Sequence, residues 1–126
     1  MTVGEYGEYN KVTGNYILLD VRTAEEFANK HKDYWRNIGH LKNAVNIPLA
    51  DISNRYIELD KSKEVLIYAF GSGKESFEAA NALQKLGFKR VTVIYGGIFN
   101  MRWTAGNVKG QSYLKDLVVD IPEANQ

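Results

Sequence analysis

The chain has 126 residues, of which 44% are hydrophobic and 25% are charged, and its formal net charge is +1. These values are typical of one globular domain. They exclude the strongly basic balance of many nucleic-acid-binding proteins and the long apolar runs of membrane spans. We therefore expect a single domain over 1–126 that binds neither nucleic acid nor a membrane. The first residues lack the pattern of a signal peptide, so a cytoplasmic location is expected.

The sequence contains no cysteine. This excludes disulfides, thiolate metal ligands and cysteine nucleophiles. His31 and His40 are the only histidines, and without thiolates they are too few for a zinc site. We therefore expect no metal and no cofactor.

The first third of the chain predicts one strand and one helix. Residues 1–15 are rich in Gly, Tyr, Asn and Glu and are expected to be a loosely held entry segment. The apolar run 16–20 predicts a buried strand. Thr23 followed by Glu26 is a capping-box pattern, which predicts the start of a helix. Residues 29–38 are polar with two large aromatic residues, which favours an inserted loop or short turn.

The middle of the chain predicts two strands and two helices. Residues 45–47 form a short apolar run that Pro48 ends, and 49–59 have apolar residues at helical spacing. The run 65–69 is the clearest buried strand. The helix that follows it has one apolar face, and Gly87 lies where a C-terminal cap is expected.

Residues 91–95 predict another buried strand, and a short helix should follow and extend to Trp103. The tail 112–122 is expected to pack back on the body. Apolar strands that alternate with helices indicate a mostly parallel sheet covered on both faces. Ligands of such sheets bind outside the carboxyl ends of the strands, and the loop after residue 69 lies at such an end.

Five segments in order resemble the rhodanese-like family. They are Leu-Leu-Asp-Val-Arg with Glu-Glu-Phe behind it, the Gly-His to Ile-Pro segment, the strand with its Gly-Ser-Gly loop, the helix behind that loop, and a Val to Gly-Gly segment with a later Trp. In this chain they begin at 18, 39, 65, 79 and 93, and the resemblance covers about 16–106. It implies a three-layer α/β fold with a mostly parallel sheet between helices.

In that family the loop begins with a nucleophilic cysteine, and its enzymes are thiosulfate sulfurtransferases. Counting from the strand, Ala69 takes the cysteine position. Counting back from the helix, Phe70 takes it and Glu75 takes the position of the family's arginine. The loop is one residue longer than that of the sulfurtransferases, which resembles the phosphatase-like branch.

The resemblance implies that the loop amides form an anion cradle at a helix N-terminus. The candidate site consists of Ala69, Phe70, Gly71, Ser72, Gly73, Lys74 and Glu75. The alternative is a simple strand-to-helix turn that uses glycine for its backbone angles. Without the cysteine we expect a binding or regulatory module whose ligands are a small anion and a protein partner. The alternative is a sulfurtransferase- or phosphatase-related enzyme that uses another group.

Outside the loop, two clusters have both a functional and a structural interpretation. Asp20 and Arg22 could take part in catalysis, but we expect Asp20 to accept loop hydrogen bonds and Arg22 to pair with a carboxylate. Tyr34, Trp35 and Arg36 could form a contact patch, because these residue types anchor interfaces. They could equally fold onto the domain's own surface.

Overall fold

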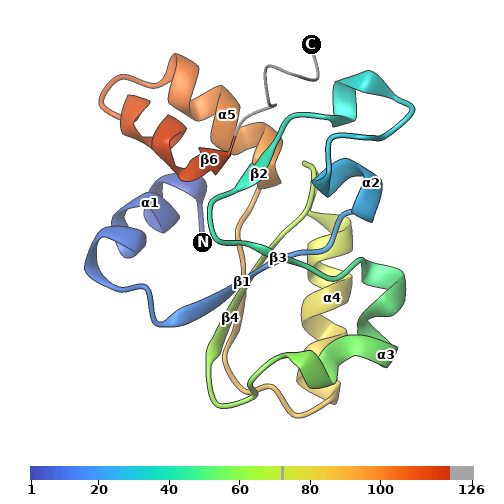
Figure 1. Cartoon of the computed structure of the whole chain (residues 1–126). Helices are drawn as coiled ribbons and strands as arrows, with labels where there is room; N and C mark the ends of the chain where they lie inside the picture. Colours follow the sequence, from blue (N-terminus) through green and yellow to red (C-terminus); the bar gives the residue numbers. More distant parts are fainter. Residues whose placement is uncertain (72, 120–126) are drawn as a thin grey trace.

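The computed structural model describes residues 1–71 and 73–119 (Figure 1). In this part of the chain the main sheet has four strands, all parallel, in the order β3–β1–β4–β5. They are β1 (Tyr16–Asp20), β3 (Val45–Asn46), β4 (Glu64–Tyr68) and β5 (Val91–Val93). The predicted strand 65–69 is thus a middle strand of a parallel sheet.

Strand β4 is buried on both faces, as its uninterrupted apolar sequence predicts. Val65 and Ile67 belong to one buried cluster, and Leu66 and Tyr68 belong to the other. All four side chains are fully buried. This split follows from the two-residue period of a strand, and it requires a helical layer on each face.

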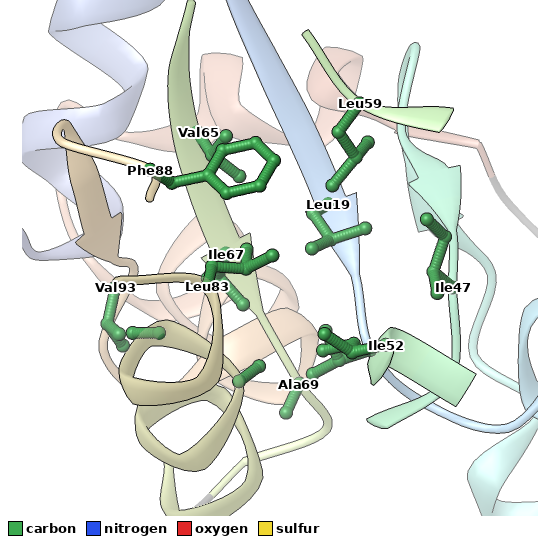
Figure 2. Close-up of a cluster of buried hydrophobic side chains, with 13 residues drawn as sticks. Leu19, Ile47, Ile52, Leu59, Val65, Ile67, Ala69, Leu83, Phe88 and Val93 are labelled. Carbon is green, nitrogen blue, oxygen red and sulfur yellow. The ribbon is translucent and has the colours of Figure 1, made fainter. Parts of the chain in front are cut away.

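The helical layer on the Val65 and Ile67 face of the sheet consists of α4 (Lys74–Lys85) and the short helices between residues 49 and 58. Figure 2 shows the cluster that this layer forms with the sheet, where Leu83 of α4 and Phe88 pack beside Ile67 and Leu19. The predicted helix over 49–59 is present as three short pieces: η2 (Leu49–Asp51), α3 (Ile52–Arg55) and η3 (Tyr56–Glu58). Gly87 has φ +100° and directly follows Leu86, the C-cap of α4, as expected for a C-terminal capping glycine.

The second layer consists of α1 (Val3–Val12), α5 (Gly97–Asn107) and η4 (Ser112–Leu117). The expectation that 1–15 are loosely held was wrong, because residues 3–12 form a helix. Thr2 and Glu5 form a complete capping box at its start. Val3 and Tyr6 are buried against the sheet together with Met101 of α5, which places this helix in the core.

The remaining elements lie near the carboxyl ends of the strands. They are α2 (Ala24–Phe27), η1 (Tyr34–Arg36), and a small antiparallel pair, β2 (His40–Leu41) with β6 (Val118–Val119). Through this pair, residues 112–119 of the predicted tail pack on the body, and residues 120–122 lie outside the described part. The predicted three-layer α/β fold is confirmed. Among the described residues, no helix has the length and apolar character that crossing a bilayer requires.

Candidate functional site

The loop after β4 is fixed by hydrogen bonds to the start of α5. The carbonyl oxygen of Ala69 accepts the amide of Ile98 at 3.1 Å, and that of Phe70 accepts the amide of Phe99 at 2.9 Å. Gly97 makes this approach possible: its φ is +59°, and a Cβ there would lie 2.2 Å from the carbonyl oxygen of Ala69. The pair of glycines after β5 was the sequence signal for this contact.

Gly73 begins the helix behind the loop. It is the N-cap of α4 with φ +86°, and no side chain of a described residue caps the helix here. Its carbonyl oxygen accepts the buried hydroxyl of Ser76 at 2.8 Å. Lys74 and Glu75 form the exposed first turn, and Ser72 lies outside the described residues. An uncapped N-terminus presents backbone N–H groups and the positive end of the helix dipole to a ligand.

A pocket of about 350 Å³ opens beside the loop, at the carboxyl ends of β1 and β4. Ala69, Phe70 and Glu75 line it from the loop side. Across from them lie the apolar residues Val21, Pro48, Leu49 and Ala50 and the polar residues Arg22, Thr23, Glu26 and Arg36. Three of the seven predicted site residues therefore meet in one cavity, at the end of the sheet where ligands of parallel sheets bind.

Asp20 and Arg22 form a buried ion pair under this pocket. The Arg22 Nη2 atom donates to Asp20 Oδ2 at 2.7 Å and to the carbonyl oxygen of Gly39 at 2.9 Å. The Arg22 amide also donates to Asp20 Oδ1 at 2.9 Å, as expected for Asp20. Burial lowers the pKa of Arg22, but the Asp20 carboxylate outweighs burial and leaves the pKa above its ordinary value. The structural interpretation of both residues is thus supported by geometry.

One nitrogen of this buried arginine has no partner. Arg22 Nη1 makes no hydrogen bond with any described residue, although the side chain is 1% exposed. Next to it, Tyr68 is fully buried, and its hydroxyl accepts the amide of Leu41 at 2.9 Å. Burial raises the pKa of Tyr68 well above its usual range, so the phenol stays neutral. Because the Asp20 carboxylate balances the Arg22 guanidinium and the phenol is neutral, these three buried side chains together carry no net charge.

The 29–38 insertion folds back onto the loop. The edge of Trp35 contacts the ring of Phe70, with 5.5 Å between centroids. The Arg36 guanidinium lies 4.4 Å from the Trp35 ring centroid, and its Nη1 is 3.3 Å from Glu26 Oε2. Trp35 packs on the domain, as the structural interpretation expects, and remains 49% exposed. The contact patch stays a prediction. The place of Trp35 against Phe70 could not be predicted from local sequence.

The chemistry available at this site is limited. Neither Ala69 nor Phe70 supplies a nucleophile, and the Ser76 hydroxyl is buried and bonded to a backbone carbonyl. His40 lies in β2 with its ring stacked on Phe27, 4.2 Å between centroids. Among the described residues, no group of three or more acidic, His or Cys side chains could hold a metal ion.

The model of the rhodanese-like domain family matches residues 8–102. This chain belongs to that family. A sulfurtransferase of Allochromatium vinosum is 33% identical over 86 residues, which cover 68% of this chain and 71% of that protein. The protein YibN of Escherichia coli is 31% identical over 94 residues, covering 73% of this chain and 58% of the relative. A Bacillus subtilis relative is 33% identical over 87 residues, and this rhodanese-like chain spans only 40% of that protein.

Solved structures support the same fold. A rhodanese-like domain protein of Staphylococcus aureus has a TM-score of 0.66 and 24% identity, over 79% of this chain and 87% of that one. A rhodanese-related protein of Thermoplasma volcanium has a TM-score of 0.64 and 21% identity, over 96% and 95% of the two chains. At these identities the likeness shows the rhodanese-like fold and nothing finer.

Proposed function

We propose that this rhodanese-like domain has no sulfurtransferase activity and acts as a binding or regulatory module whose vestigial loop binds a small anion. The observation that carries the proposal is the composition of the loop. Ala69 and Phe70, the two candidates for the cysteine position, both line the pocket, and the whole chain has no thiol. Sulfur transfer requires a thiolate that takes the outer sulfur of thiosulfate as a persulfide and releases sulfite.

No other group can replace that thiolate. The two methionine sulfurs belong to thioethers, and Met101 is fully buried in the core. The alternative of a phosphatase-related enzyme requires a nucleophile at the loop. Among the described residues from 69 to 76, Ser76 alone has a hydroxyl, and this hydroxyl is fully buried and donates to the carbonyl oxygen of Gly73. Lys74 is exposed and supplies a positive charge beside the helix N-terminus, which favours binding of an anion without chemistry.

An assay with thiosulfate and cyanide tests the first half of the proposal. The expected production of thiocyanate equals that of a heat-killed control. The Allochromatium vinosum sulfurtransferase is a suitable positive control in the same buffer. Turnover by this chain well above the killed sample would contradict the proposal.

An NMR titration with inorganic phosphate tests the second half. The amides of Gly71, Gly73 and Lys74 should shift. We expect a Kd on the order of 1 mM, which corresponds to roughly −4 kcal/mol. Lys74→Ala should weaken binding, whereas Lys85→Ala, at the far end of the same helix, should not. Added salt should weaken binding through screening. If these loop amides stay unchanged while other amides respond, the loop is only a turn.

A further inference from the structure

The segment between α2 and β2 is held together by hydrogen bonds to itself. We define the strap as residues 31–37, which contain η1 (Figure 1, the cyan turn above α2). The His31 amide donates to Asn37 Oδ1 at 2.8 Å, and Asn37 Nδ2 donates to the His31 carbonyl oxygen at 2.9 Å. Inside the strap, the Asp33 amide donates to His31 Nδ1 at 3.0 Å, and the Arg36 amide donates to the Asp33 carbonyl oxygen at 2.9 Å. A short loop whose ends meet in this way keeps its own shape.

Two residues with positive φ flank the strap. Asn29 has φ +60° and Gly39 has φ +82°. Both are fixed to the body of the domain, because the Asn29 amide donates to the Glu26 carbonyl oxygen at 3.2 Å and the Gly39 carbonyl oxygen accepts Arg22 Nη2 at 2.9 Å. The Gly39 amide also donates to Asn29 Oδ1 at 3.0 Å, so the two flanks lie side by side. Adjacent turn residues at both ends of a segment can absorb the change of φ and ψ that a hinge needs.

Few contacts attach the strap to the rest of the described molecule. None of its residues is buried. The hydrogen bonds that the strap forms with described residues stay within it, except for one from Arg36 Nη1 to Glu26 Oε2 at 3.3 Å. The other attachment is Phe70, whose ring centroid lies 5.5 Å from that of Trp35 and 5.3 Å from the Arg36 guanidinium. Segments with few buried contacts open at low free-energy cost.

Both attachment points of the strap belong to the pocket. Glu26 and Phe70 line the pocket, and so does Arg36 from the strap itself. Ala69, which is only 3% exposed, lies in the same wall. Trp35 is not among the lining residues, so it can influence the pocket only through what it holds in place. Release of the strap from the pocket wall would therefore change access to the pocket without breaking a core contact.

We propose that the strap is a lid, which rotates as one unit about Asn29 and Gly39 and controls access to the pocket. In the closed form, Trp35 and Arg36 contact the pocket wall. In the open form, these contacts are broken and the bonds between the two ends of the strap remain. The inference goes beyond anion binding by the loop. Because its tests use no anion, a failure of phosphate binding leaves the lid intact, and a failure of the lid leaves phosphate binding intact.

A thiol in the pocket wall measures how often the lid opens. The chain has no cysteine, so Ala69→Cys supplies a single thiol at a nearly buried position. Iodoacetamide should react with it while the lid is open. Adding Trp35→Ala to this protein should raise the alkylation rate roughly threefold to tenfold, the factor expected for loss of one aromatic contact. Tyr34→Ala is the matched control: this ring in the same turn is 84% exposed, and its loss should change the rate less than about twofold.

A thiol in the core separates lid opening from a general loss of stability. Ala79 of α4 is fully buried, so an Ala79→Cys thiol reacts only after wider unfolding. Trp35→Ala should change the alkylation rate of this thiol less than about twofold. If Trp35→Ala speeds alkylation of both thiols by the same factor, or of neither, the lid inference is wrong.

Hydrogen exchange of the amides inside the strap tests whether it moves as one unit. Trp35→Ala should leave the exchange rates of the Asp33 and Arg36 amides nearly unchanged, although the Ala69→Cys thiol becomes more reactive. Asn37→Ala is the positive control, because it removes both bonds between the ends of the strap, and it should raise these exchange rates several-fold. If Trp35→Ala raises them by the factor seen for alkylation, the strap unfolds locally instead of rotating. If Asn37→Ala leaves them unchanged, its bonds do not hold the strap together. Either result would overturn the proposal.

Discussion

Arg22 holds Asp20 in a buried ion pair, with 2.7 Å between Nη2 and Oδ2 and side chains that are 1% and 0% exposed. Asp20 is the last residue of β1 and Arg22 lies two residues beyond it, so the pair fixes the chain where it leaves the sheet toward the pocket. Removing one member of a buried pair leaves the other charge without compensation. We expect Arg22→Ala to lower the free energy of unfolding by about 3–5 kcal/mol in urea denaturation.

An exposed ion pair in the same protein is the control for this prediction. Arg55 and Glu58 lie 2.8 Å apart with side chains 41% and 51% exposed. Solvent screens such a pair, so Arg55→Ala should lower the free energy of unfolding far less than Arg22→Ala does. Equal losses for the two arginine variants would show that the Asp20 pair contributes no more than a surface pair.

Gly97 should be essential for the position of the loop. Any side chain there has to adopt φ +59° and would collide with the carbonyl oxygens of Ala69 and Phe70. Backbone strain alone costs roughly 1–3 kcal/mol, and relief of the collision would disrupt the amide bonds from α5. We therefore expect Gly97→Ala to destabilise the protein by more than about 2 kcal/mol in urea unfolding.

Gly106, in the last turn of the same helix, is the matched control. A Cβ there meets nothing within 4 Å. Gly106→Ala should be neutral or stabilise the protein by up to about 1 kcal/mol, because alanine loses less backbone entropy in a helix. If both alanine variants unfold at the same urea concentration, the contact of Gly97 with the loop is not a constraint.

Local sequence patterns predicted most of the fold. Strand β4 was readable because an apolar run between turn residues is buried on both faces, and the motif order located the loop behind it. Helix α1 was not predicted, because it contains two glycines and has no strong apolar stripe. The helix is instead stabilised by tertiary packing that no local pattern shows. Gly7 allows η4 to approach closely, because a Cβ at this position would lie 2.4 Å from the Leu114 side chain.

The sequence predicted which segment forms the candidate site, but not which distant residues contact it. Loop residues 69–75 were identified from their place between β4 and α4. The ring of Trp35 on Phe70 joins residues that are far apart in sequence, and no local pattern encodes such a contact. The same holds for Arg36 with Glu26 at the pocket, because the conformation of 29–38 depends on what it packs against.

His40 should make stability depend on pH. Burial lowers the pKa of His40, and its Nδ1 atom has no hydrogen-bond partner among the described residues. The unfolded chain, with a histidine pKa near 6.5, therefore binds a proton more readily than the folded protein does. This contribution to stability is complete above about pH 6.5 and is lost as the pH falls toward the lower folded pKa.

The measurement compares wild type with His40→Phe, which keeps an aromatic ring for stacking on Phe27 and cannot titrate. Urea unfolding at several pH values between about 7.5 and 5.5 should show a steeper loss of stability for wild type than for the variant. His31 is present in both proteins, so it cancels in the comparison. Parallel curves would mean that His40 does not titrate differently on folding.

Single-cysteine variants should test whether a loop position faces the N-terminus of α4. The natural chain has no cysteine, so one introduced thiol is observed without background. Ala69 is 3% exposed, whereas Phe70 is partly exposed, and both line the pocket. We expect the Phe70→Cys thiol to react with iodoacetamide faster than the Ala69→Cys thiol. Because the uncapped N-terminus of α4 stabilises a thiolate, the pKa of the Phe70→Cys thiol should fall below the ordinary value of about 8.5.

The pH dependence of alkylation, followed by mass spectrometry, gives the thiol pKa. Ile57→Cys places a thiol on an exposed position remote from the loop and is the reference for an ordinary value. Unfolding in urea should bring the Phe70→Cys thiol to the reference pKa, because the helix N-terminus is then lost. If both loop thiols have pKa values at or above that of the Ile57→Cys variant, the loop does not favour negative charge. The amides of Gly71 and Gly73 then serve only to turn the chain from β4 into α4.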